Sequence, residues 1–355
     1  MKTKLFFIDL MEAFNSSNGQ TPRKGVRLVG LLLSVILLWS CGHEKKRDVY
    51  FSSFEKEIVP ERLPVGFSDT IPLIVGSVVP VEDGYWCYLY ENENCLLATD
   101  KDFVPKAYFA RRGAGPGEVS NISGAYGDNL WDNGMYSVFE PSSGNVYGTN
   151  AANNYNLKKV VSLEPLRKYA VWKVVKLKDG RYVAVKGDNT CGVVEYDPSD
   201  GSIKEWPLGF DLEKADVPEG KMSMFSVIQY NPKQGIIAVI YGNNPTVILY
   251  DENGNILRTL TYSDYKPVED SSGNIARCYS SMRLTDDHIW LLLAGEMGKG
   301  NNTLMVLDYD GKPVARIPVG NAMKFCVDSA TGRLIAIDYT ASESGLVVYD
   351  LPDLD

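Results

Sequence analysis

Short apolar runs separated by turn-forming residues fill most of this chain. The runs are four to eight residues long and rich in β-branched and aromatic side chains, with Gly, Asn and Asp between them. Clear examples are Tyr85–Tyr90, Tyr182–Val185, Ile236–Tyr241 and Ile289–Leu293. No long stretch has the apolar spacing of an amphipathic helix. The pattern therefore predicts an all-β protein built from short strands.

Two turn patterns recur along the chain. In the first, one strand ends at an acidic turn and the next strand begins, as at Asp83-Gly84 and Asp179-Gly180. In the second, an aromatic residue or Leu is followed by Asp and then by Gly, as after Tyr250 and Leu307. Asp-Gly favours tight hairpin turns because both residues tolerate a positive φ. The recurrence predicts repeated units of strands joined by hairpins.

The length of the repeating part indicates how many units it holds. Residues Ile71 to Asp355 number 285, and a four-stranded unit takes about 45–50 residues. We therefore predict a six-bladed β-propeller of four-stranded antiparallel blades. The predicted blades span residues 71–115, 116–167, 168–212, 222–266, 275–319 and 320–355. The last has three strands of its own, so an N-terminal strand at Glu55–Val59 is predicted to supply the fourth and close the ring.

The first 40 residues have the features of a signal peptide. Three cations, Arg23, Lys24 and Arg27, precede the uncharged apolar run Leu28–Trp39, and Cys41 follows shortly after. An apolar run of about twelve residues is too short to span a bilayer as a helix. The order predicts a lipoprotein signal peptide over residues 1–40, lipid attachment at Cys41, a tether over 41–53 and the propeller over 54–355.

A glycine-rich stretch lies between the first two predicted blades, and its sequence is Arg111-Arg112-Gly113-Ala114-Gly115-Pro116-Gly117-Glu118. Glycine reaches backbone angles closed to other residues and proline fixes its own φ, so the stretch predicts a tight corner. Two cations enter this corner and one carboxylate leaves it. It is not a nucleotide-binding loop, because Glu118 stands where Gly-x-Gly-x-x-Gly requires its last glycine.

The Gly-x-Gly-Pro-Gly-Glu corner at 113–118 and the lipobox-like Leu38-Trp39-Ser40-Cys41 together carry a resemblance. The chain resembles the TolB-like six-bladed β-propeller lipoproteins of Gram-negative bacteria, over most of its length after residue 40. The resemblance implies an outer-membrane lipoprotein whose acylated Cys41 is the mature N-terminus. No acidic cluster directly follows Cys41, so we expect the chain to face the periplasm, with the cell surface as the alternative.

Acidic residues outnumber basic ones, 45 to 36, which gives a net charge of −9. Residues 1–40 carry a net +3, so their removal leaves −12. An acidic chain without clustered cations is a poor partner for nucleic acid. It also does not adhere to an anionic membrane by itself. We therefore expect no nucleic-acid partner, and attachment to the membrane through the N-terminal lipid.

Few residues suit catalysis or metal binding. His288, in the turn Asp286-Asp287-His288, is the sole histidine of the predicted propeller, which excludes a His-based triad or a multi-His metal site. The five cysteines after Cys41 form no Cys-x-x-Cys pair and mostly lie in apolar runs, so they are predicted to be buried. We predict no metal, no cofactor and no catalytic residue. A converging pair of carboxylates, as in glycoside hydrolases, is left open.

Aromatic and charged residues in the loops between blades and at the starts of inner strands are the candidates for ligand binding. Such residues surround the central channel of a propeller, a concave surface suited to a sugar, a peptide or an anionic group. The candidates are Arg111, Arg112, Glu118, Trp172, Lys173, Arg277, Tyr279 and Lys324, with Phe225 as a further aromatic. The structural alternative is that Arg112 pairs with Glu118 while Trp172 and Phe225 pack between blades.

The favoured hypothesis is a lipid-anchored ligand-binding or protein-interaction module of the cell envelope, without catalysis. Its expected partners are the membrane, through the anchor, and an envelope protein, carbohydrate or peptide. Two alternatives stay open: a carbohydrate-active hydrolase or lyase using channel carboxylates, and a sensor partner of an envelope signalling system. Propellers host many unrelated functions, so the fold alone does not choose among them.

Overall fold

The computed structural model describes residues 47–64, 74–115, 117–122, 135–187, 192–210, 226–266, 278–295, 301–341 and 344–354. The chain divides into two units, 1–46 and Arg47–Asp355, and every described residue belongs to the second. The predicted signal peptide 1–40 and Cys41 lie outside the described residues, as do Pro116, Cys191, Phe225 and Arg277. In the part of the chain that is described, no helix is long and apolar enough to cross a membrane.

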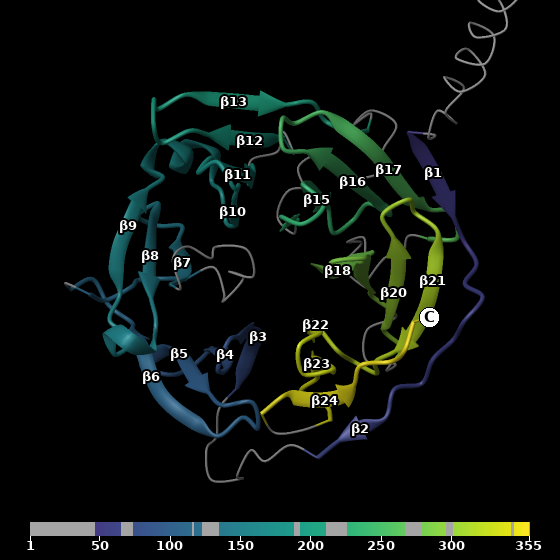
Figure 1. Ribbon diagram of the computed structural model, residues 1–355, viewed down its shortest axis with the longest axis horizontal. Coiled ribbons are helices and arrows are strands. Elements are labelled where there is room, and N and C mark those ends of the chain that lie inside the picture. The colour runs from purple at the N-terminus through teal and green to yellow at the C-terminus, as the bar shows by residue number, and fades with distance from the viewer. Residues whose placement is uncertain are drawn as a thin grey trace, which may run out of the picture. The chain divides into compact units, whose positions relative to one another are not determined.

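The Arg47–Asp355 unit is a six-bladed β-propeller, with six small sheets around a ring (Figure 1). The first three blades contain β3 (Val75–Val81), β4 (Gly84–Leu89), β5 (Asn94–Thr99) and β6 (Pro105–Arg111); β7 (Tyr136–Glu140), β8 (Asn145–Thr149) and β9 (Lys158–Ser162); and β10 (Val174–Lys176), β11 (Tyr182–Val185), β12 (Val193–Tyr196) and β13 (Ile203–Trp206). The short 3₁₀ turns η1 (Ala151–Asn153) and η2 (Glu164–Tyr169) flank β9.

The other three blades contain β14 (Val227–Asn231), β15 (Ile236–Ile240), β16 (Thr246–Asp251) and β17 (Ile256–Tyr262); β18 (Tyr279–Leu284), β19 (His288–Leu293), β20 (Thr303–Asp308) and β21 (Pro313–Pro318); and β22 (Lys324–Asp328), β23 (Arg333–Ile337) and β24 (Leu346–Asp350). Successive strands within each blade pair antiparallel. Every blade falls inside its predicted boundaries, so the prediction of a six-bladed all-β propeller is confirmed. The second blade has three described strands.

The segment before the first blade follows the outer edges of the last three blades. Strand β1 (Asp48–Phe51) pairs in parallel with β17. Glu57 then forms an isolated bridge with Arg316 of β21, and β2 (Arg62–Leu63) pairs antiparallel with β24. Figure 1 shows this segment in purple along the outside of the ring. We call residues 47–63 the strap.

The strap closes the ring with an N-terminal strand, as predicted, but with a different segment. Strand β2, at Arg62–Leu63, pairs with the sixth blade, whereas Glu55–Val59 was expected there and is displaced by one blade to the fifth. On the edge of the fifth blade, the Ile58 N–H donates to the Arg316 carbonyl and the Arg316 N–H donates to the Lys56 carbonyl, both at 2.9 Å. Residues 48–51 fall inside the predicted tether 41–53 and form β1, so the folded part of the described chain begins at Asp48.

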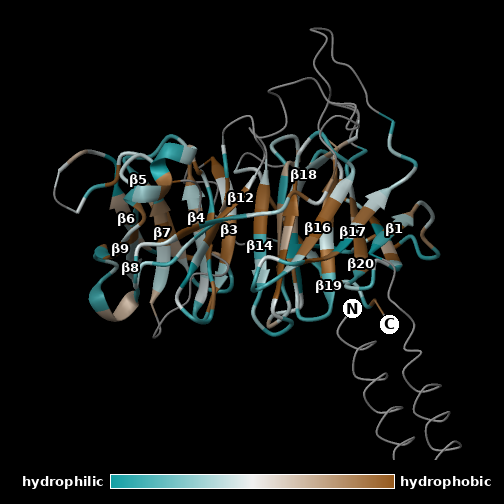
Figure 2. Ribbon diagram, turned by 90° about the horizontal axis from the view of Figure 1, so that it is seen from above, coloured by the Kyte–Doolittle hydropathy of each residue, from teal (hydrophilic) through white to brown (hydrophobic). Residues whose placement is uncertain are grey.

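Among the described residues, the hydrophobic core consists of six clusters, one between each pair of neighbouring blades. In β15, for example, Ile237 and Val239 face the third blade, while Ala238 and Ile240 face the fifth. Strands covered on both faces explain why the sequence shows near-continuous apolar runs rather than strict alternation. Figure 2 shows hydrophobic residues mainly on the strands and hydrophilic residues mainly in the turns that join them. Burial of apolar area, at about 25 cal/mol per Å², is the main force holding the blades together.

Polar contacts reinforce the junction at which the sixth blade meets the first. The hydroxyl of Tyr85 donates to Asp328 Oδ2 at 2.9 Å, and the Tyr85 ring stacks on Phe103 with centroids 4.4 Å apart. Burial raises the pKa of Tyr85 to about 12, so its hydroxyl stays a donor at physiological pH. Arg333 lies 3.3 Å from Asp102 across the same junction. The two blades furthest apart in sequence are therefore fixed side by side.

Candidate functional site

Most of the predicted site residues lie at one end of the ring. Each blade repeats the same order of strands, so the innermost strands run in the same direction and begin at one end, which we call the entry end. The described candidates are found where strands begin or end there. Trp172 and Lys173 precede β10, Tyr279 begins β18, Lys324 begins β22, and Arg112 follows β6.

The Gly113–Glu118 corner joins the first blade to the second, and Glu118 folds back over its glycines. The N–H of Gly115 donates to Glu118 Oε2 at 2.9 Å. A Cβ on Gly113 would lie 1.8 Å from that oxygen, so only glycine leaves room for the carboxylate. Gly117 has a φ of 79°, in the left-handed region, and no atom lies within 4 Å of where its Cβ would be. Space thus requires Gly113, whereas backbone conformation requires Gly117.

The two arginines of the corner have different partners. Arg111 Nε lies 2.7 Å from Glu93 and 3.8 Å from Glu118. Arg112 donates instead to three backbone carbonyls of the turn between β4 and β5, those of Leu89, Tyr90 and Asn92, at 2.6–2.9 Å. The cation that lies near Glu118 is therefore Arg111, whereas the structural alternative named Arg112. These contacts give the corner a structural role, and ligand binding by Arg111, Arg112 and Glu118 stays a prediction.

Lys173 belongs to a cluster of two cations and one amide inside the ring. The amide oxygen of Gln229, oriented by its hydrogen bonds, accepts from Lys173 Nζ at 2.8 Å and from Arg283 Nη1 at 2.9 Å. Gln229 lies on β14 and Arg283 on β18, so three neighbouring blades contribute one residue each. Gln229 is 1% exposed and Arg283 6%, whereas Trp172, next to Lys173, is 57% exposed. The alternative that Trp172 packs between blades is therefore wrong.

Tyr279 and Lys324 begin their strands in different environments. Tyr279 is fully buried between the fourth and fifth blades, and its hydroxyl donates to the carbonyl of Pro245 at 3.2 Å. Burial raises the pKa of Tyr279 well above its usual value. Lys324 Nζ instead lies 3.5 Å from the hydroxyl of Tyr90 and 5.8 Å from the centre of its ring, at the surface. Ligand contact by either residue stays a prediction, and the position of Lys324 suits it better.

Lys324 belongs to an exposed patch where the sixth blade meets the first. The hydrophobic residues of this patch are all exposed. The hydroxyl of Tyr339 donates to the carbonyl of Val75, the residue after Ile74, at 2.8 Å. The Tyr90 N–H donates to the carbonyl of Ile74 at 3.2 Å, which places both tyrosines at the start of β3. We call this surface the Tyr90 patch; its members are Ile74, Tyr90, Met323, Lys324 and Tyr339.

Glycines hold the two tyrosines of the patch against the backbone. A Cβ on Gly76 would lie 2.7 Å from the ring of Tyr90, and one on Gly345 would lie 2.4 Å from the ring of Tyr339. Tyr90 also packs edge-on against Tyr88, with ring centroids 5.4 Å apart. Rings seated on glycine in this way are fixed before any ligand arrives. The Tyr90 patch is thus a preorganised aromatic surface with a cation at its edge.

The other candidates from the sequence have structural explanations. Asp286, beside His288, forms an ion pair with Lys233 at 2.9 Å, and the His288 N–H donates to Thr285 Oγ1 within the turn. Four cysteines are buried free thiols, as predicted, and burial raises the pKa of Cys87 to about 12; they are Cys87, Cys95, Cys278 and Cys326. No three His, Cys, Asp or Glu side chains of the described chain are grouped so as to hold a metal ion.

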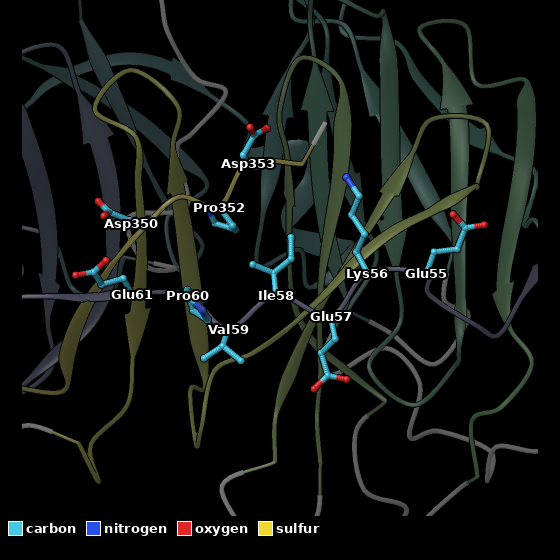
Figure 3. Close-up of a pocket in the computed structure, with 10 residues that line it drawn as sticks. All are labelled: Glu55, Lys56, Glu57, Ile58, Val59, Pro60, Glu61, Asp350, Pro352 and Asp353. Carbon is cyan, nitrogen blue, oxygen red and sulfur yellow. The ribbon is translucent and has the colours of Figure 1, made fainter.

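An open groove of about 650 Å³ lies where the strap passes the C-terminal residues. Figure 3 shows its lining, which comes from residues 55–61 of the strap and from Asp350, Pro352 and Asp353. Five of these side chains are acidic and one, Lys56, is basic. Lys56 Nζ donates to the carbonyl of Leu354 at 3.2 Å, and Ile58 packs against the core between the last two blades. The groove is therefore explained by the strap passing the C-terminal residues where it closes the ring.

Four residues of these clusters were not among the candidates predicted from the sequence: Gln229, Arg283, Tyr90 and Tyr339. The signal for the first two is a polar residue inside an apolar inner strand, in Val227-Ile228-Gln229-Tyr230 and in Met282-Arg283-Leu284. A strand buried on both faces has little tolerance for such side chains unless they meet a partner. Tyr90 and Tyr339 follow apolar runs at strand ends, and only the ring places them together.

No protein-family model matches this chain, and no curated protein sequence matches it. A candidate exported protein of Bacteroides fragilis superposes with a TM-score of 0.54 at 12% identity, over 85% of this chain and 98% of its own. A member of the DUF4221 family from Bacteroides vulgatus gives 0.53 at 11%, over 84% and 97%. An auxiliary nutrient binding protein of Bacteroides thetaiotaomicron gives 0.46 at 9%, over 74% and 65%. The first two show that this chain shares its propeller fold with known structures.

Proposed function

We propose that this protein is a lipid-anchored propeller of the bacterial cell envelope that binds a ligand at the entry end of its ring and does not convert it. The Tyr90 patch is the observation that carries this proposal. Exposed tyrosines stack on sugar rings and on peptide groups, and a flanking lysine adds a donor and a positive charge. The patch lies at the entry end, beside the starts of the inner strands β3 and β22.

The anchor follows from the N-terminal pattern rather than from the propeller. Acylation at Cys41, with two or more chains, gives stable membrane attachment. The net charge of −12 after removal of residues 1–40 makes binding of the body to an anionic surface unfavourable. The proposed location is the periplasmic face of the outer membrane, and the shared fold of a candidate exported Bacteroides protein accords with export. Intact mass of detergent-extracted protein should show a diacylglycerol-modified Cys41; residues 28–39 still attached would contradict the anchor.

The binding proposal is tested with a panel of envelope oligosaccharides and peptides. Purified mature protein is titrated with each, and any compound that binds is titrated against Tyr90→Ala. Tyr50→Ala is the matched control, because Tyr50 is 72% exposed on β1 at the outer edge of the ring. We expect at least a tenfold weaker Kd for Tyr90→Ala and no change for Tyr50→Ala. Equal loss in both variants would contradict the proposed surface.

The same incubation separates binding from catalysis. The mass of the bound compound is measured after prolonged contact with the protein. A binding module returns the compound unchanged, whereas a hydrolase or lyase yields products of altered mass. Product formation that depends on the protein would replace the proposed function by the enzyme alternative.

A further inference from the structure

An exposed tryptophan stands at the entry end of the third blade. Trp172, shortly before β10, is 57% exposed, whereas the other described tryptophans, Trp86, Trp206 and Trp290, are at most 4% exposed. The Trp172 indole forms no ring contact and no hydrogen bond with another described residue. Tryptophan is enriched at binding surfaces, because it combines a large apolar ring with a polar N–H. Trp172 is therefore available to a ligand.

The backbone around Trp172 is fixed by a close approach at Gly187. The Gly187 N–H donates to the Tyr169 carbonyl at 2.9 Å, and the Ala170 N–H donates to the Arg167 carbonyl at the same distance. A Cβ on Gly187 would lie 2.1 Å from the Ala170 carbonyl oxygen and 3.2 Å from Trp172 Cδ1. Only glycine fits there, so the chain before β10 packs directly on residue 187. The ring is thus presented by ordered backbone, which lowers the cost of binding.

Two lysines gather around the neighbouring ring of Tyr169. Lys168 Nζ lies 4.9 Å and Lys186 Nζ 5.0 Å from the centre of that ring, within the range of a cation–π interaction. Lys186 is buried and pairs with Glu205 at 2.8 Å. The charge of Lys186 is therefore balanced, whereas Lys168 is exposed.

The last turn of η2 adds uncompensated positive charge beside Trp172. Arg167 and Lys168 form this turn, and both are exposed. Neither forms an ion pair with a described residue. The carboxylate of η2, that of Glu164, belongs to its first turn, at the opposite end. The cations stand out on a chain whose net charge is −9. We call this the Trp172 surface; its members are Arg167, Lys168, Tyr169, Trp172 and Lys186.

We propose that the Trp172 surface is a second binding site and that it takes an acidic saccharide. A sugar ring stacks on the exposed indole, and its carboxylate pairs with Lys168 or Arg167. An indole that stands in solvent suits a sugar ring better than a peptide, because the anchor residues of peptide and protein partners fill pockets. The Trp172 surface comes from the junction of the second and third blades, so it shares no residue with the Tyr90 patch.

A matched pair of sugars tests the charge requirement. Full-length protein in non-ionic detergent is titrated calorimetrically with hexagalacturonate and with the neutral hexamer obtained by reducing its carboxyl groups. Hexagalacturonate should bind more tightly than the neutral hexamer, and its affinity should fall as sodium chloride is added, because exposed charges are screened. Equal affinities, or no binding of hexagalacturonate at millimolar concentration, would overturn the proposal.

Two variants locate the site. Trp172→Ala should weaken the Kd for hexagalacturonate about tenfold, and Lys168→Gln should weaken it and reduce its salt dependence. Both residues are exposed, so the melting temperature should stay close to that of the wild type. Lys178→Gln is the matched charge control, because Lys178 is exposed in the turn between β10 and β11 at the opposite end of the ring. An unchanged Kd in Trp172→Ala, or equal losses in Lys168→Gln and Lys178→Gln, would overturn the proposal.

Two further titrations separate this proposal from its rivals. Hexaglutamate is the acidic-peptide probe, and tighter binding of hexaglutamate than of hexagalacturonate would overturn the assignment to a saccharide. Hexagalacturonate affinity that falls in Tyr90→Ala but not in Trp172→Ala would overturn the second site and leave the proposed function in place. Affinity that falls in Trp172→Ala but not in Tyr90→Ala supports the second site, whatever the binding panel shows for the Tyr90 patch.

Discussion

Replacing Gly113 by alanine should destabilise the corner between the first two blades by displacing Glu118. The new Cβ would lie 1.8 Å from Glu118 Oε2 and 2.5 Å from Cδ, both far shorter than the non-bonded contacts that a Cβ makes in proteins. Both atoms belong to the far end of a flexible side chain, so the carboxylate swings away while the backbone stays in place. The stability lost is then that of the contacts which Glu118 makes in its native position.

Those contacts set the magnitude. The hydrogen bond from the Gly115 N–H to the carboxylate is 2.9 Å long, and a bond to a charged group contributes about 1.5–3 kcal/mol. The Glu118 side chain is 27% exposed, so we expect about 1–2 kcal/mol after solvent screening. The contact of Glu118 with Arg111 at 3.8 Å adds at most about 0.5 kcal/mol, because both groups reach solvent. Gly113→Ala and Glu118→Ala should therefore destabilise by similar amounts.

A double-mutant cycle tests this reasoning. Free energies of unfolding are measured by urea denaturation for Gly113→Ala, Glu118→Ala and the double variant. Once Glu118 is truncated, the alanine at 113 has nothing to displace, so the double variant should resemble either single one, with a coupling of about 1 kcal/mol or more. Gly117→Ala is the control. Its penalty of about 1–2 kcal/mol comes from the left-handed φ and should add to that of Glu118→Ala. Additivity between Gly113→Ala and Glu118→Ala would refute the displacement mechanism.

Three further predictions concern the strap, a buried acid and the thiols. Phe51→Ala should destabilise by about 3–5 kcal/mol in urea denaturation, because Phe51 is buried against Tyr262, whereas Val59→Ala, on the exposed part of the strap, should have almost no effect. Burial acts to raise the pKa of Glu140, but hydrogen bonds from Ser143 and Ser120 outweigh it and leave the pKa below its usual value. Its stabilisation is therefore complete above the usual pKa of about 4.3 and is lost as the pH falls through the lowered value. Glu140→Gln should therefore be less stable than wild type at pH 7, and the difference should shrink as the pH falls below about 4.3. The buried thiols are those of Cys87, Cys95, Cys278 and Cys326. Iodoacetamide at pH 8 should label none of them in the native protein and all of them in urea, as read from peptide masses. Labelling of any of them in the native protein would contradict their burial.

The fold was predictable because local signals repeat. Each blade carries its own apolar runs and acidic glycine turns, so number, order and boundaries follow from the sequence. The strand that closes the ring was harder to predict from the sequence. This strand, β2, has only two residues, Arg62 and Leu63, and no pattern distinguishes them from their neighbours. The strap's path is set by the outer edges of three blades, which local sequence does not encode.

Of the candidate site, only the features that depend on nearby sequence were predictable. Lys173 and Lys324 stand at the starts of inner strands, and a repeat register places them at the entry end. Their partners Gln229 and Tyr90 come from other blades, so the pairings depend on the curvature of the ring. The glycines of the corner predicted its tight turn. They did not predict that Glu118 packs on Gly113 and accepts a hydrogen bond from Gly115, and ligand binding by Glu118 stays a prediction.

The central claim is that ligand binds at the Tyr90 patch, and a site-specific photo-crosslink tests it most directly. A benzophenone amino acid is placed at position 90 or, as the control, at position 50 of the full-length chain in a Gram-negative host. Irradiated protein is recovered from the membrane and its intact mass is measured. Crosslinking at 90 should yield a discrete added mass that an excess of the compound identified in the binding panel removes, and position 50 should yield none. An adduct of the same mass at position 50, or persistence of the position-90 adduct under competition, would contradict binding at the patch.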